Sequence, residues 1–201
     1  MSQPDPLFEK AIARFDAENA EDPNRDIVEG TPVPKELLYA RRMTQWLERL
    51  APDASVPLRL SARCQHLRRW EIPRSSFPMD RAGYHRWRTD LARMHADRAG
   101  EILRDVGYDE PTIARVQSLV RKEWLKQDAE AQLLEDVICL VFLESYFAEF
   151  ARQHDEPKLI GILRRTWKKM SPRGHAEALK LPLGDRERAL VERALANAMN
   201  R

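Results

Sequence analysis

The stretch LLEDVICLVFLESYF, residues 133–147, constrains the fold most, because it places two carboxylates at the head of a run that is otherwise almost entirely apolar. On a helical wheel with 100° per residue, Asp136 is flanked by Leu133 and Leu140. Apart from Asp136 and its neighbour Glu135, every face of this helix is apolar for two turns. We therefore expect the helix to be buried on all sides, at the centre of a helical core.

The remaining sequence also has the period of helices. Apolar stripes bounded by Pro, Asp and Gly signals predict further helices, and the expected set spans residues 5–19, 35–50, 57–71, 84–106, 110–126, 128–147, 156–170, 172–180 and 185–200. Long loops are expected at 21–34 and 72–83. The sequence predicts an all-α fold: a single compact domain of eight or nine helices over residues 1–201, with its core at about 35–170 and C-terminal helices in 171–201.

Composition narrows the class of protein. A chain of 201 residues holds one well-buried core, and its net charge of +2 is too small for a general nucleic-acid coat. The two cysteines, Cys64 and Cys139, lie in apolar helical patterns and are expected to be reduced core residues in the cytoplasm. No signal peptide is expected at the N-terminus, and the longest apolar run, 137–143, is too short to cross a membrane.

Three roles are open for the two acids of the central helix. They are helix residues favoured by the macrodipole, partners in a buried salt bridge, or ligands and catalytic groups. With Asp128 as the N-cap, both acids fall in the second turn, which weakens the first role. An unpaired buried carboxylate loses its charge, so we expect each to have a specific partner.

Two of the five histidines lie on helices that can face the central helix. His66 borders an apolar stripe, and His95 lies directly on one. Each is open to interpretation as an ordinary core histidine. Together with a buried Asp136 they also form a donor set that divalent metals bind, since neutral imidazole and carboxylate suit zinc, iron and manganese. The other three histidines are expected at the surface.

Residues 59–93 carry nine arginines, no lysine and three acidic residues. Guanidinium groups match phosphate or carboxylate, and the interleaved Trp and Tyr residues suit stacking on a base. Arg69 and Arg74 are the favoured anion-binding residues, since they flank the junction just after His66. The alternative is that these arginines lie on a solvated face or pair with the acidic remainder of the chain.

The stretch from His95 to Glu144, together with SARCQHLRRW (61–70), resembles the HD superfamily of helical, metal-dependent phosphohydrolases. The resemblance implies that Asp136 and His66 belong to a metal site. Leu67 stands where the superfamily has its signature Asp, and Lys122 where several branches have a His. Glu36 or Tyr39 lies where the first His of the superfamily would lie.

More closely, the runs ELLYARRM, QHLRRWEIPR, GYHRWR, QLLEDVICLVFLE and TWKKMS resemble a family catalogued as domain of unknown function 4202, over roughly residues 5–180. That resemblance implies a fold and no particular activity.

These observations lead to one main hypothesis and two alternatives. The main hypothesis is a metal-dependent hydrolase of a small phosphorylated or nucleotide-like substrate, in which a divalent ion activates water. The expected residues are His66, His95 and Asp136 as metal ligands, Glu135 and Lys122 in catalysis, and Arg69 and Arg74 on the substrate. The alternatives are a non-catalytic protein that binds an anionic ligand or, less favoured, RNA, and an iron-dependent oxygenase. The sequence is silent on oligomeric state.

Overall fold

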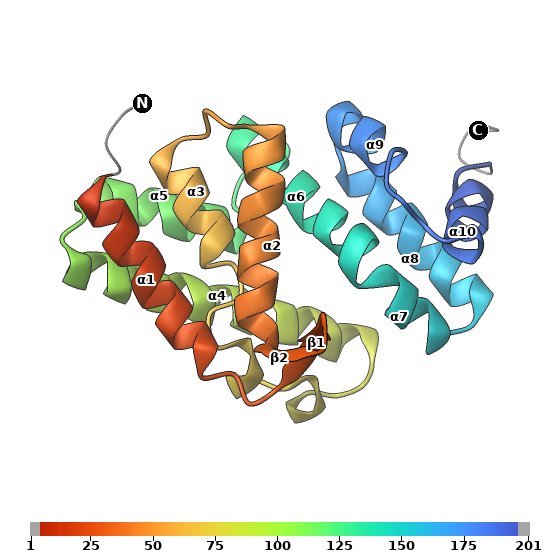
Figure 1. Ribbon diagram of the computed structural model, residues 1–201, viewed down its shortest axis with the longest axis horizontal. Helices are drawn as coiled ribbons and strands as arrows, with labels where there is room; N and C mark the ends of the chain where they lie inside the picture. Colours follow the sequence, from red (N-terminus) through yellow and green to blue (C-terminus); the bar gives the residue numbers. More distant parts are fainter. Residues whose placement is uncertain (1–4, 197–201) are drawn as a thin grey trace. The chain divides into compact units, whose positions relative to one another are not determined.

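The computed structural model describes residues 5–196, and these are mainly helical, as the sequence predicted. Contacts within the chain divide it into two compact units, residues 1–124 and 125–201, and each is described by itself (Figure 1). That the whole chain forms a single domain stays a prediction.

The first unit holds five helices, two short strands and two 3-10 turns. In chain order these are α1 (Pro6–Ala20), β1 (Arg25–Val28), β2 (Thr31–Pro34), α2 (Lys35–Leu50), α3 (Val56–Arg63), η1 (Arg69–Glu71), η2 (Arg74–Ser76), α4 (Arg81–Val106) and α5 (Glu110–Arg121). Side chains of Asp5, Ser55, Asp80 and Asp109 accept hydrogen bonds from first-turn N–H groups and so begin four of these helices. Gly107 ends α4 in the left-handed region, at φ +110°.

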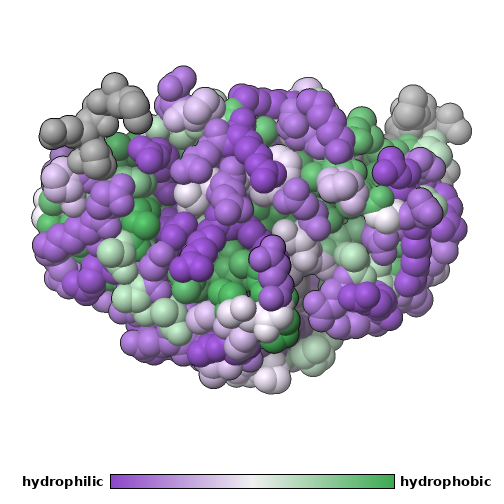
Figure 2. All heavy atoms as spheres, in the orientation of Figure 1, coloured by the Kyte–Doolittle hydropathy of each residue, from purple (hydrophilic) through white to green (hydrophobic). Residues whose placement is uncertain are grey.

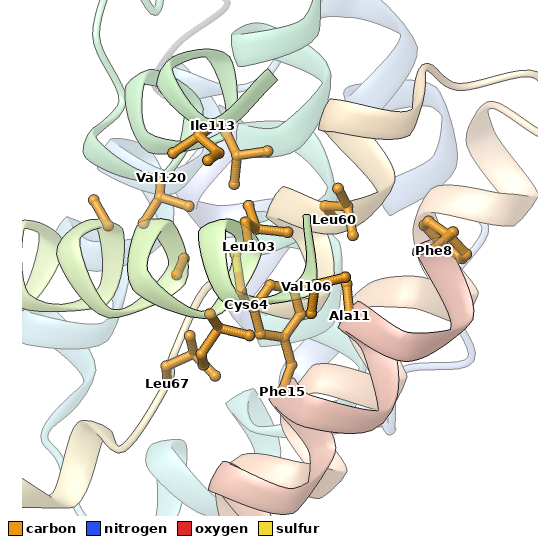
Figure 3. Close-up of a cluster of buried hydrophobic side chains, with 14 residues drawn as sticks. Phe8, Ala11, Phe15, Leu60, Cys64, Leu67, Leu103, Val106, Ile113 and Val120 are labelled. Carbon is orange, nitrogen blue, oxygen red and sulfur yellow. The ribbon is translucent and has the colours of Figure 1, made fainter. Parts of the chain in front are cut away.

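The core of the first unit lies where α1, α3, α4 and α5 meet (Figure 3). Phe15 of α1 is fully buried, as are Leu60 of α3, Leu103 of α4 and Ile113 of α5. Figure 3 shows these side chains converging from separate helices, with α1 approaching from one side. Packing against this core therefore fixes the positions of these helices and of the polar side chains on them.

The described part of the second unit, residues 125–196, has five helices. They are α6 (Ala129–Ser145), α7 (Phe147–Arg152), α8 (Glu156–Lys169), α9 (Pro172–Ala178) and α10 (Asp185–Ala196). Helix α6 contacts α7, α8 and α9, and most of its apolar residues are buried, although Leu133, Ile138 and Phe142 are partly exposed. Glu135 and Asp136 are each only 2% exposed. The two carboxylates therefore do lie in a dry environment.

The predicted helix 57–71 is wrong at its C-terminal half. Helix α3 ends at Arg63, and the chain then turns until Arg68 reaches the left-handed region at φ 48°. The backbone N–H of Arg68 donates to Asn19 Oδ1 at 3.1 Å, and that of Cys64 still bonds to Leu60 O. This turn, residues 64–68, holds His66.

The expected loop 21–34 contains an antiparallel two-stranded ribbon, which the sequence did not predict. Asp22 begins this segment and is completely buried. Its Oδ1 accepts hydrogen bonds from the backbone and side-chain nitrogens of Asn24, and its Oδ2 accepts from the backbone N–H of Glu36 at 3.0 Å. Pro34, the N-cap of α2, makes no side-chain cap bond, so Asp22 satisfies the start of α2 instead.

Other boundaries differ by a few residues. Helix α4 begins at Arg81 and α5 ends at Arg121, and the central helix is followed by the separate short helix α7. The part of the predicted helix 185–200 beyond residue 196 lies outside the described residues.

Hydrophilic side chains cover most of the face shown in Figure 2, with hydrophobic ones in small areas between them. Among the described residues, no helix has the length and apolar character needed to cross a membrane.

Candidate functional site

Helix α2 and the turn after α3 bring a carboxylate and an imidazole together in the first unit. His66 Nδ1 lies 3.0 Å from Glu36 Oε2, a hydrogen-bonding distance. The ring of Tyr39, one turn along α2 from Glu36, stacks on the His66 ring with centroids 3.9 Å apart. Glu36 is 8% exposed, so this pair lies largely away from water.

His95, on α4, also contacts the turn of residues 64–68. Its Nδ1 lies 2.8 Å from the carbonyl oxygen of Leu67, and its ring centroid is 5.7 Å from that of His66. Arg69 completes the group, with Nε 3.7 Å from Glu36 Oε1. We call Glu36, Tyr39, His66, Arg69 and His95 the Glu36–His66 cluster.

Burial dominates the electrostatics of the cluster. It raises the pKa of Glu36 to about 7, although the positive charge of Arg69 acts in the opposite direction. Burial, followed by the charge of Arg69, holds the pKa of His66 well below its usual value. Burial also lowers the pKa of His95 to about 3 and lowers that of Arg69. Both histidines are therefore neutral near pH 7, while Glu36 is close to its midpoint.

A protonation change at Glu36 alters His66 as well. When Glu36 is protonated it donates to Nδ1 of His66, so the proton of the imidazole sits on Nε2. When Glu36 is ionised it accepts from Nδ1–H, and Nε2 then has a lone pair. A neutral imidazole with a free lone pair is a general base.

The two favoured arginines have different roles. Arg69 lies over the Trp87 ring, 4.8 Å from its centroid, beside the cluster. Arg74 donates to the carbonyl oxygens of Phe77, Pro78 and Asp80 at 3.0, 2.7 and 3.2 Å, so its guanidinium holds the 72–83 loop in shape. Positive charge from Arg88 and Lys122 also acts to lower the pKa of His66.

Asp136, in the second unit, has its own partners. Its Oδ1 accepts from the backbone N–H of Ser171 at 2.7 Å and from Gln132 Nε2 at 3.2 Å, and its Oδ2 accepts from the Ser171 hydroxyl. A Cβ on Gly174 would lie 2.7 Å from Asp136 Oδ1, so the start of α9 packs directly on this carboxylate. Asp136 thus joins α6 to the N-terminus of α9 through hydrogen bonds.

Glu135 is the other acid of the motif. Its Oε1 lies 3.5 Å from Nζ of Lys169, whose side chain is about half exposed. An ion pair was one of the roles left open for it by the sequence.

Of the predicted metal ligands, His66 and His95 belong to the first unit and Asp136 to the second. His66 and His95 are neighbours, and Glu36 joins them at the position where the resemblance placed a first ligand. Within residues 5–196, no group of three or more His, Cys, Asp or Glu side chains stands in an arrangement that holds a metal ion. The metal set of His66, His95 and Asp136 stays a prediction.

Sequence reasoning missed Asp22, which fixes Glu36 through the backbone of α2. The sequence Asp-Pro-Asn at 22–24 is typical of a turn in which the Asp side chain bonds to a nitrogen two residues later. That signal predicts the turn. It does not predict the bond to Glu36, because the bond joins residues 14 apart.

A family model described as "Domain of unknown function (DUF4202)" matches residues 9–191. No curated protein and no solved structure matches the chain. The resemblance to the HD superfamily thus receives no support from these comparisons.

Asp136→Ala tests the structural role of that carboxylate. The substitution leaves the Ser171 N–H and the Ser171 hydroxyl without their acceptor, so we expect the free energy of unfolding to fall by about 3 kcal/mol. Urea denaturation followed by circular dichroism measures it. The control is Glu144→Ala, an exposed position on the same helix, with an expected change within about 0.5 kcal/mol. Equal small effects for the two variants would contradict the role.

Glu36→Gln tests the buried carboxyl. Because the pKa of Glu36 is raised from 4.5 to about 7 on folding, the folded state binds more protons in that interval, and the wild type loses stability as the pH rises through it. The neutral amide of Glu36→Gln does not titrate, so the variant does not undergo this loss of stability. We expect the stability of Glu36→Gln relative to wild type to rise by about 3 kcal/mol between pH 4.5 and pH 8.

The measurement is denaturant unfolding at intervals across that pH range. Glu48→Gln, at an exposed position on the same helix, is the matched control and should track the wild type. A Glu36→Gln difference that stays constant with pH, or that shrinks as pH rises, would show that the Glu36 pKa is not raised.

Proposed function

We propose that this chain, which belongs to the family described as domain of unknown function (DUF4202), binds a small phosphorylated or nucleotide-like anion at the Glu36–His66 cluster and hydrolyses it. The observation that carries the proposal is the 3.0 Å pairing of Glu36 with His66, in which burial shifts the pKa of both groups. Titratable groups perturbed by burial and by a specific charged partner are typical of catalytic sites.

The charge around the pair favours an anionic ligand. Arg69, Arg88 and Lys122 contribute positive potential at His66. The Glu36 carboxyl lies beside His66, and the charges of Asp22 and Asp26 act on Glu36. Arg69 Nε lies 3.7 Å from Glu36 Oε1, and the planar fork of its guanidinium matches a phosphoryl group.

The chemistry follows from the ionised form of Glu36. Nε2 of His66 takes a proton from a water molecule as the water oxygen forms a bond to phosphorus and the ester P–O bond breaks. The carboxylate of Glu36 stabilises the imidazolium that results, through the hydrogen bond at Nδ1. The imidazolium then returns the proton to the departing oxygen, so the enzyme ends the cycle in its starting state.

The metal-dependent mechanism of the HD superfamily is the second candidate. His66 and His95 lie side by side, and His95 Nε2 is a buried nitrogen without a hydrogen-bond partner among the described residues, so two of the expected ligands are neighbours. Within residues 5–196, however, no group of three or more His, Cys, Asp or Glu side chains stands in an arrangement that holds a metal ion, and Glu36 is engaged with His66. The Glu36–His66 cluster as described therefore does not fit a divalent ion.

A non-catalytic anion-binding protein is the remaining alternative. The same positive potential and the stacked pair of Arg69 and Trp87 support it equally well. Turnover decides between the two classes, because a binding protein retains the anion unchanged.

The test is hydrolysis of aryl phosphates, sugar phosphates and nucleoside monophosphates by untagged protein. His66→Asn is expected to reduce kcat/KM by about 100-fold or more, as for loss of a general base. In the wild type, kcat/KM should rise with pH to a plateau above about pH 7, because Glu36 must ionise before Nε2 of His66 accepts a proton. Glu36→Gln should lose that rise.

His85→Asn is the control, since His85 is exposed and lies outside the cluster. Full activity in His66→Asn, or a kcat/KM that falls between pH 6 and pH 8, would refute the role of His66 as a general base. Activity that survives chelation fits the proposed mechanism. Activity abolished by chelation and restored by manganese, iron or zinc would favour the metal-dependent candidate, with metal content then compared among wild type, His66→Ala and Asp136→Ala by mass spectrometry.

A further inference from the structure

One ring nitrogen of His95 has a hydrogen-bond partner in the fold, and the other has none among the described residues. Nδ1 lies 2.8 Å from the carbonyl oxygen of Leu67. A carbonyl oxygen only accepts hydrogen bonds, so Nδ1 carries the proton. Because His95 is 2% exposed and neutral, Nε2 has no hydrogen and is an acceptor alone.

Nε2 of His95 is buried and has no hydrogen-bond partner among the described residues. Buried polar atoms are nearly always paired, and the exceptions concentrate at sites that bind a ligand, an ion or an ordered water. The His95 ring lies beside His66, with centroids 5.7 Å apart, so the unpaired nitrogen belongs to the Glu36–His66 cluster.

The charge at this nitrogen narrows the kind of group that pairs with it. Arg69, Arg88 and Arg98 all lower the pKa of His95, so the position is electropositive. A positively charged donor such as an ammonium group is disfavoured there by repulsion. A neutral O–H donor meets no such cost and supplies the hydrogen that Nε2 lacks.

We infer that the ligand of the Glu36–His66 cluster carries a hydroxyl group close to its phosphoryl group, and that this hydroxyl donates to Nε2 of His95. The substrate class is then a phosphorylated sugar or polyol, including the ribose of a nucleotide. This inference rests on the proposed function, since it takes the anion to bind at the same cluster. His95 is a specificity-determining residue: a ligand without the hydroxyl leaves the acceptor unpaired and binds more weakly.

The inference is tested by calorimetric binding of three probes to chelator-treated protein: inorganic phosphate, ribose 5-phosphate and n-butyl phosphate, whose chain has no hydroxyl. Wild type should bind ribose 5-phosphate about tenfold or more tightly than n-butyl phosphate, the scale of one well-formed hydrogen bond. In His95→Leu the two affinities should become equal, while inorganic phosphate still binds. His95→Gln, which keeps an acceptor oxygen, should recover part of the preference, and His85→Leu should keep all of it.

A second measurement needs no substitution. In wild-type protein with ¹⁵N-labelled histidine, ribose 5-phosphate should shift the His95 Nε2 resonance toward the value of a hydrogen-bonded acceptor, and n-butyl phosphate should not. The same preference in wild type and His95→Leu, or an unshifted resonance, would overturn the inference. So would a preference present only before chelation, which would assign Nε2 to a metal. Failure of all three probes to bind wild type would instead refute the proposed function.

Discussion

The hydrogen bond between Glu36 and His66 is the interaction on which the functional account depends. It places an ionisable carboxyl against an imidazole in a largely dry environment, so neither group keeps its usual pKa. Desolvation is the larger effect at Glu36, and the charge of Arg69 offsets it only in part. The balance leaves the carboxyl near its midpoint at neutral pH, where a small change in surroundings removes the proton of Glu36 or restores it.

Much of the first unit serves to hold this pair. Asp22 fixes the start of α2 through the Glu36 N–H, and His95 and Asn19 fix the turn that carries His66. The core formed by α1, α3, α4 and α5 supports these contacts (Figure 3). The polar contacts come from four separated parts of the sequence, so the geometry at His66 depends on the tertiary fold as a whole.

The sequence predicted the helices well, and it singled out His66 and His95 of the candidate site but not Asp22. Apolar periodicity identifies α6 as buried because that signal is local, and it identified His66 and His95 as neighbours of a core. The end of α3 was not predictable, since the apolar stripe continues through Leu67 while Asn19, far away in sequence, captures the Arg68 N–H. The partners of Asp136 could not be predicted from the sequence either, because Ser171 lies 35 residues away along the chain. Glu36 appeared only as a substitute for a missing histidine, since its burial is a property of the fold.

The most direct test of the central claim is the pH titration of the His66 ring nitrogens by ¹⁵N NMR in histidine-labelled protein, with assignment by His66→Asn. The account predicts that His66 stays neutral while its proton moves from Nε2 to Nδ1 as the pH rises through about 7, the pKa of Glu36. His95 should keep its proton on Nδ1 throughout. A His66 that becomes an imidazolium with an ordinary pKa near 6.5, or whose tautomer does not change, would contradict the account.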